Sequence, residues 1–138
     1  MSNGGTDLPI ASDERLARFI LFSKWIRSSD SGKTVKPDAF IPYPYSDLSV
    51  TRHKNLSEQE LWCIGQAIAD ARPATLYGRA DICAAEARRQ SLSIEPRPVS
   101  NNPNHAVVLG WPVDKPAQKI IAQELAAKAN FVTKPLPV

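Results

Sequence analysis

Two histidines are the residues of this chain best suited to acid–base chemistry. His53 stands in the basic tripeptide Arg52-His53-Lys54, and His105 follows a turn-forming stretch at 101–104. Each lies at one end of a segment with strand character, where functional residues often occur. If the two strands are neighbours, one imidazole can take a hydroxyl proton while the other protonates the leaving oxygen of a phosphodiester, with Arg52 and Arg79 on the phosphate. This set of residues is typical of a small metal-independent ribonuclease or phosphotransferase.

A binding surface is the simpler interpretation, because most lone polar residues near turns serve structure rather than chemistry. The stretch Ile41-Pro42-Tyr43-Pro44-Tyr45 alternates proline and tyrosine, so Tyr43 and Tyr45 form a stiff aromatic surface that loses little entropy on binding. The cations predicted to surround it are Arg52, Lys54, Arg79, Arg88 and Arg89. A binding surface tolerates many arrangements, whereas an acid and a base must each come within about 3 Å of one phosphate. We therefore favour a non-enzymatic interaction or accessory module, whose partner is a protein or a nucleic-acid backbone.

Other kinds of site are disfavoured by residue spacing. No two histidines lie one helical turn apart, so we expect no metal site, and the sequence predicts no cofactor. The stretch Ser31-Gly32-Lys33-Thr34 lacks the earlier glycine of a phosphate-binding loop. Cys63 and Cys83 lie in apolar sequence with helical character, which favours reduced thiols packed in the core and leaves a disulfide between them open.

The segment 77–81 allows two interpretations. A glycine at position 78 can place the side chains of Arg79 and Asp81 together at a tight corner. Capping preferences favour an ordinary helix start instead, with Asp81 as the cap and Arg79 in solvent.

The composition is that of an ordinary globular protein. Of 138 residues, 43% are hydrophobic and 22% are charged, which suits one domain with a core of its own. The net charge is +3, and the excess lies in residues 70–138, which hold nine basic and six acidic residues. Such a charge is compatible with a phosphate-bearing partner and also suits solubility alone. The sequence indicates no oligomeric state.

The expected location is the cytoplasm. The first residues show no signal-peptide pattern, and no run reaches the ~18 apolar residues that a membrane span needs. We expect no association with a membrane.

The order of elements predicts an α+β fold, with a small mixed or antiparallel sheet and about three helices packed mainly on one face. Residues 13–133 are expected to form the domain, between flexible tails at 1–12 and 134–138. Residues 13–27 leave helix and strand open. Leu16, Phe19, Ile20 and Ile26 keep helical spacing, but the dense apolar run at 19–22 favours a buried strand, paired in a hairpin with 39–41.

The clearest local signal is a capping box at Ser57 and Glu60, with Leu56 placed to pack on Leu61. It starts a helix that ends before Pro73. A second capped helix begins at Asp114, with a buried stripe of Ala117, Ile120, Ile121 and Leu125. The remaining predicted elements are strands at 48–53, 75–77, 92–94 and 105–111, and a helix from Asp81 to about Gln90.

Overall fold

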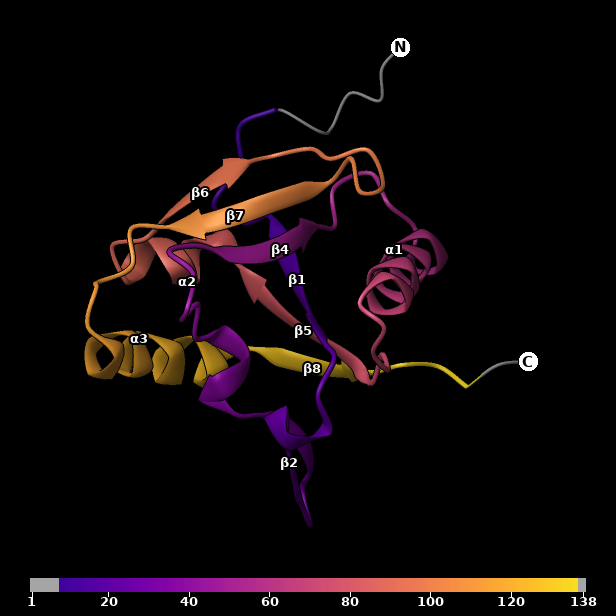
Figure 1. Ribbon diagram of the computed structural model, residues 1–138, viewed down its shortest axis with the longest axis horizontal. Helices are drawn as coiled ribbons and strands as arrows, with labels where there is room; N and C mark the ends of the chain where they lie inside the picture. Colours follow the sequence, from indigo (N-terminus) through magenta and orange to yellow (C-terminus); the bar gives the residue numbers. More distant parts are fainter. Residues whose placement is uncertain (1–7, 137–138) are drawn as a thin grey trace.

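A six-stranded antiparallel sheet forms the centre of the protein in the computed structural model, which describes residues 8–136 (Figure 1). The strand order is β6-β7-β4-β1-β5-β8, and each neighbouring pair is antiparallel. The strands are β1 (Arg15–Ile20), β4 (Leu48–Arg52), β5 (Gly78–Cys83), β6 (Ser93–Pro96), β7 (His105–Leu109) and β8 (Asn130–Thr133). A separate ribbon pairs β2 (Ile26–Ser29) with β3 (Gly32–Val35). Together with three helices, this sheet confirms the α+β fold.

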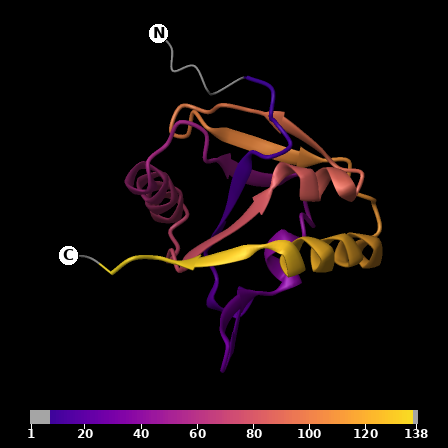
Figure 2. The same cartoon turned by 180° about the vertical axis from the view of Figure 1, so that it is seen from behind.

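The helices cover both faces of the sheet, two on one side and one on the other. They are α1 (Glu58–Ala71), α2 (Ala84–Arg89) and α3 (Lys115–Lys128), with short 3-10 turns η1 (Ser23–Trp25) and η2 (Pro37–Phe40). Each face of the sheet has its own hydrophobic core, and the residues of β1 alternate between the two. Leu16 and Ile20 lie in the core that α2, α3 and η2 complete, whereas Ala17 and Phe19 lie in the core against α1. Figures 1 and 2 show α1 across the sheet from α2 and α3. In the described part of the chain, no helix combines the length and apolarity needed to cross a bilayer.

The ambiguous segment 13–27 contains a strand, because β1 lies between β4 and β5 and is buried on both faces. Burial on both faces explains why its apolar residues showed no alternation. The predicted hairpin with 39–41 is wrong. Residues 26–29 pair with 32–35 instead, and Ala39 and Phe40 enter the core from the 3-10 turn η2, which begins at Pro37.

The segment 75–90 also differs from the prediction. Residues 75–77 form no strand, and Asp81 caps no helix but lies within β5, which pairs with β1 along its whole length. The helix α2 starts only at Ala84, with Cys83 at its N-cap. Cys63 and Cys83 are free and exposed, so their predicted core packing is wrong. The final strand, β8, was not predicted; it pairs with β5 at the sheet edge.

Part of each predicted tail lies against the domain. Ile10 is buried, and the backbone oxygens of Leu8 and Ser12 accept hydrogen bonds from Arg52 Nη1 (2.8 Å) and the Ala85 amide (2.9 Å). At the other end, the amide of Lys134 donates to the Tyr77 carbonyl (3.1 Å). The rest of the predicted tails includes 1–7 and 137–138, which lie outside the described residues.

Local capping signals fixed the starts of α1 and α3 as predicted. The Glu60 amide donates to Ser57 Oγ (3.1 Å), and the Ser57 amide donates to Glu60 Oε1 (2.8 Å), which completes the capping box. Asp114 accepts from the Ala117 amide at the start of α3 (3.1 Å). The buried face of α3 is shifted from the prediction. It consists of Gln118, Ala122 and Leu125, while Ile120 is 64% exposed.

Replacing Ser57 by Ala tests the capping box. Ser57→Ala removes the acceptor of the Glu60 amide, and we expect a loss of about 1 kcal/mol in the free energy of unfolding. Urea denaturation followed by circular dichroism measures it. Gln59→Ala, in the same exposed turn, is the matched control and should leave stability unchanged; equal losses in both variants would contradict a specific cap.

Candidate functional site

The main sheet opens between β1 and β4. These strands pair only at Leu16–Arg52 and Ala17–Thr51, whereas β1 pairs with β5 over all six of its residues. Figure 1 shows β1 and β5 running steeply away from β4 and β7. Beyond the last pair, backbone groups of β1 and β4 no longer bond to each other, and they need other partners.

Arg18 occupies this opening with its side chain. Its Nε donates to the carbonyl of Ala39 (2.8 Å) and its Nη1 donates to the carbonyl of Ser49 on β4 (3.1 Å). The guanidinium also lies over the ring of Trp25, 5.4 Å from its centroid. One cation therefore bridges β1, β4 and η2 where the strands separate.

Two cavities adjoin at this opening, with volumes of about 180 and 490 Å³. Four residues line both of them: Arg18, Trp25, Ser49 and Arg72. The smaller cavity extends towards His105 and the 99–102 loop. The larger cavity extends along the segment 41–45. We call the two together the Arg18–Arg72 groove.

The groove carries positive charge that no carboxylate neutralises directly. Within residues 8–136, neither Arg18 nor Arg72 forms an ion pair with an acidic side chain. Burial, together with the nearby charge of Arg72, lowers the pKa of Arg18 to about 10. The acid on the wall, Asp47, lies 3.4 Å from Arg97 Nη1. Arg18 is half-buried and Arg72 is exposed, and two nearby like charges of this kind favour a bound anion.

Aromatic side chains form the rim of the larger cavity. Tyr43 is 58% exposed and Tyr45 is 73% exposed, and Phe22, at 41%, packs edge-on against Trp25 with ring centroids 4.8 Å apart. Lys115 adds a cation 4.8 Å from the Tyr43 ring centroid. The groove thus places exposed ring faces beside unneutralised guanidinium groups.

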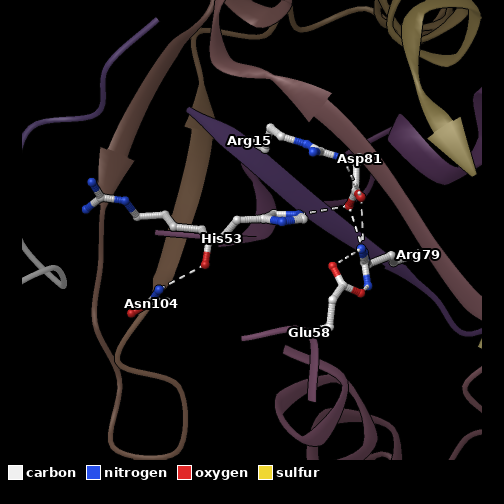
Figure 3. Close-up of polar contacts among 7 residues, drawn as sticks. Arg15, His53, Glu58, Arg79, Asp81 and Asn104 are labelled. Atoms are coloured by element: carbon white, nitrogen blue, oxygen red, sulfur yellow. Dashed lines mark hydrogen bonds and ion pairs between the residues drawn. The ribbon is translucent and has the colours of Figure 1, made fainter. Parts of the chain in front are cut away.

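A second polar cluster surrounds Asp81 (Figure 3). His53 Nε2 lies 3.0 Å from Asp81 Oδ1, Arg79 Nε donates to the same carboxylate (3.0 Å), and Arg15 lies 3.6 Å away. Arg79 also donates through both terminal nitrogens to Glu58, at 3.0 Å each. The cluster joins β1, β5, the end of β4 and the first turn of α1.

This Asp81 cluster balances its own charges. The side chains of Arg79 and Asp81 are 3% and 2% exposed, and the Arg79 guanidinium lies 4.7 Å from the Trp62 ring centroid. The hydrogen bonds from Arg79 lower the pKa of Glu58. A buried cation that has two carboxylate partners and an aromatic neighbour is satisfied, so the cluster holds the elements together and orients the His53 imidazole.

The arginines predicted to form the surface lie elsewhere. Arg52 is fully buried, and its guanidinium bonds to Glu14 (Nη2 to Oε1, 2.9 Å), so a surface role for it is wrong. Arg79 is buried too, against its predicted place in solvent. Ion pairs with Glu14 and Asp81 hold these two guanidinium groups inside the protein and offset the cost of burying their charge.

The other predicted cations do not line the groove. Lys54 is half-buried just after β4, where its carbonyl accepts from Asn104 Nδ2 (2.8 Å). Arg88 bonds to Ser12 Oγ (3.0 Å), and Arg89 bonds to Glu86 (2.6 Å), both from α2. Of the predicted binding residues, Tyr43 and Tyr45 line the Arg18–Arg72 groove.

The two histidines have different partners, although β4 and β7 are neighbours. His53 bonds to Asp81, while His105 Nδ1 lies 2.8 Å from the Arg97 carbonyl and its Nε2 lies 3.1 Å from Ser49 Oγ. The two hydrogen-bond sets share no residue. Catalysis by this pair stays a prediction.

Sequence reasoning missed Arg18, Trp25 and Arg72. Arg18 had a usable signal, since it is the one charged residue in the apolar run 16–22. A cation inside a buried strand requires a partner or a cavity. Arg72 carried no comparable signal, because its position depends on where α1 ends over the sheet.

The described residues 8–136 contain no group of three or more His, Cys, Asp and Glu side chains placed to hold a metal ion. Comparison with protein-family models, curated proteins and solved structures found no match to this chain.

Removing the Asp81 charge tests the structural role of the Asp81 cluster. Asp81→Asn deprives the buried Arg79 of its nearest buried acid, and we expect a loss of about 3 kcal/mol in the free energy of unfolding. Glu58→Gln is the control. It removes an acid whose side chain is 69% exposed, so its cost should stay below about 1 kcal/mol. Urea denaturation measures both, and similar losses would contradict the central place of Asp81.

The ion pair between Arg79 and Glu58 makes the free energy of unfolding depend on pH. Because the pKa of Glu58 is lowered in the folded state, its contribution is present above its ordinary value of 4.5 and is lost as the pH falls through the lowered value. The stability difference between the wild type and Glu58→Gln should therefore be constant near neutrality and shrink on acidification. Denaturation curves between about pH 3 and pH 7 measure it. A difference that grows at low pH would overturn the assignment.

Proposed function

We propose that this protein is a non-enzymatic binding module for single-stranded nucleic acid, with the Arg18–Arg72 groove as its site. The observation that carries the proposal is that two arginines with no acidic partner among residues 8–136 lie beside a rim of exposed aromatic side chains. Single strands offer both a phosphate charge and unstacked base faces, which is the combination that such a groove recognises.

The floor of the groove suits a phosphate. Arg18 uses Nε and Nη1 in its bonds to Ala39 and Ser49, and its remaining N–H groups make no hydrogen bond to another described residue. A phosphate bound between Arg18 and Arg72 would relieve their repulsion and raise the pKa of Arg18 towards its usual value. Partial burial strengthens this attraction relative to an exposed site.

The rim suits bases. The larger cavity, about 490 Å³, lies within the range of sites for small organic ligands, roughly 300–1,000 Å³. Tyr43 and Tyr45 present ring faces on which a base can stack without sequence preference. A duplex keeps its bases stacked inside and cannot use these rings, so the aromatic rim favours a single strand.

The proposal includes a cytoplasmic setting, where the free thiols of Cys63 and Cys83 stay reduced. It does not extend to catalysis. The histidines bond to separate partners, and the two arginines expected on the phosphate, Arg52 and Arg79, are buried in ion pairs.

Variants of the groove test the proposal. A fluorescent oligonucleotide of about 12 residues with mixed sequence should bind at low salt, as measured by fluorescence anisotropy, and binding should weaken as salt is added. Tyr45→Ala should cost about 1–3 kcal/mol of binding free energy through lost stacking. Arg72→Gln should weaken binding while leaving thermal stability equal or higher, because it removes the charge that disfavours protonated Arg18.

Arg89→Gln is the matched control, because Arg89 is exposed on α2 and lies outside the groove. It should bind the oligonucleotide as the wild type does. Absence of binding at low salt would overturn the proposal. The aromatic rim would then be assigned to a protein partner instead of a nucleic acid. Equal affinity of Arg72→Gln and the wild type would also overturn it.

A further inference from the structure

The ribbon of β2 and β3 projects from the body of the protein (Figures 1 and 2). All residues from 27 to 34 are exposed. Its base is anchored by Val35, which is buried, and by Ile26, which packs against the same core. Because the outer ribbon adds nothing to the core, and an isolated two-stranded ribbon is marginal in stability, folding alone does not account for it.

The base of the ribbon is part of the groove wall. The ribbon starts directly after Trp25, which lines both cavities, and the Lys36 amide donates to the Trp25 carbonyl (2.7 Å) where β3 ends. Lys24 lies 5.8 Å from the ring centroid of Phe22, another wall residue. A nucleic-acid single strand bound in the Arg18–Arg72 groove would therefore pass close to the ribbon where it leaves the groove.

The ribbon has the chemistry of a nucleic-acid backbone contact. Arg27 and Lys33 lie on opposite faces, since Arg27 is opposite Thr34 and Lys33 is opposite Ser28. In the described residues neither cation has an ion-pair partner, and the acid of the turn, Asp30, lies at the tip. Ser28, Ser29 and Ser31 lie between them, and Thr34 follows Lys33; such hydroxyl groups bond to phosphate oxygens.

We propose that the ribbon binds duplex nucleic acid adjoining the single strand, so that the protein recognises a junction between single- and double-stranded regions. This inference rests on the proposed function and deepens it. A two-stranded β-ribbon has the width that a major groove admits, and cations on both of its faces reach phosphates on both sides. The single strand then continues from the duplex into the groove.

Four labelled probes test the junction: a single strand of about 12 nucleotides, the same strand as a 5′ overhang and as a 3′ overhang on a duplex of about 10 base pairs, and the blunt duplex. Fluorescence anisotropy at low salt measures each affinity. We expect one of the overhang probes to bind about tenfold more tightly than the free strand, because the duplex adds phosphate contacts on the ribbon.

The variant Arg27→Thr/Lys33→Thr should remove the tenfold gain in affinity for the overhang probe and leave the affinity for the free strand unchanged. For the overhang probe, it should also reduce the slope of log affinity against log salt by about two. Arg89→Gln/Lys119→Gln removes two exposed cations from α2 and α3 and should retain the full gain. Melting curves check that both double variants stay folded.

The outcomes separate this inference from the proposed function. If the wild type binds the free strand and no overhang improves on it, the junction inference is overturned and the proposed function stands. Retention of the gain by Arg27→Thr/Lys33→Thr also overturns the inference. If the free strand does not bind at all, the proposed function falls, and the junction inference falls with it.

Discussion

The bridge that Arg18 makes between β1 and β4 is the interaction on which the site depends. Strand backbones require hydrogen-bond partners, and where β1 leaves β4 the Ser49 carbonyl receives the guanidinium of Arg18 in place of a neighbouring strand. The sheet can therefore open without orphaning this oxygen. The opening becomes a groove with a cation on its floor, and both cavities meet there.

Arginines serve two different purposes in this fold. Arg52 and Arg79 enter the interior with Glu14 and Asp81, and these ion pairs connect segments far apart in the chain. Among the described residues, Arg18 bonds to neutral carbonyls and to no acid, so its charge stays available to a ligand. A net charge of +3 cannot distinguish the two uses, because a paired and an unpaired guanidinium count equally.

Features that depend on neighbours within a few residues were predictable. The capping box at Ser57 and the cap at Asp114 involve partners three residues away, and both formed as expected. Features that depend on which strands pair with each other were not predictable. Asp81 has the character of a helix cap in sequence, but pairing of β5 with both β1 and β8 placed it within a strand. Tertiary contacts overrode the local preference there.

The sequence by itself determined the α+β class, the start of α1 and the exposed aromatic stretch of Tyr43 and Tyr45, because periodicity, capping and proline stiffness are local properties. Only the tertiary structure decided which cations are buried and which line a groove. The bonds that decide it join residues remote in sequence: Arg18 and Ser49 are 31 positions apart, and Arg52 and Glu14 are 38 positions apart. No local pattern encodes such a distance, since it is set by how the strands are ordered in the sheet.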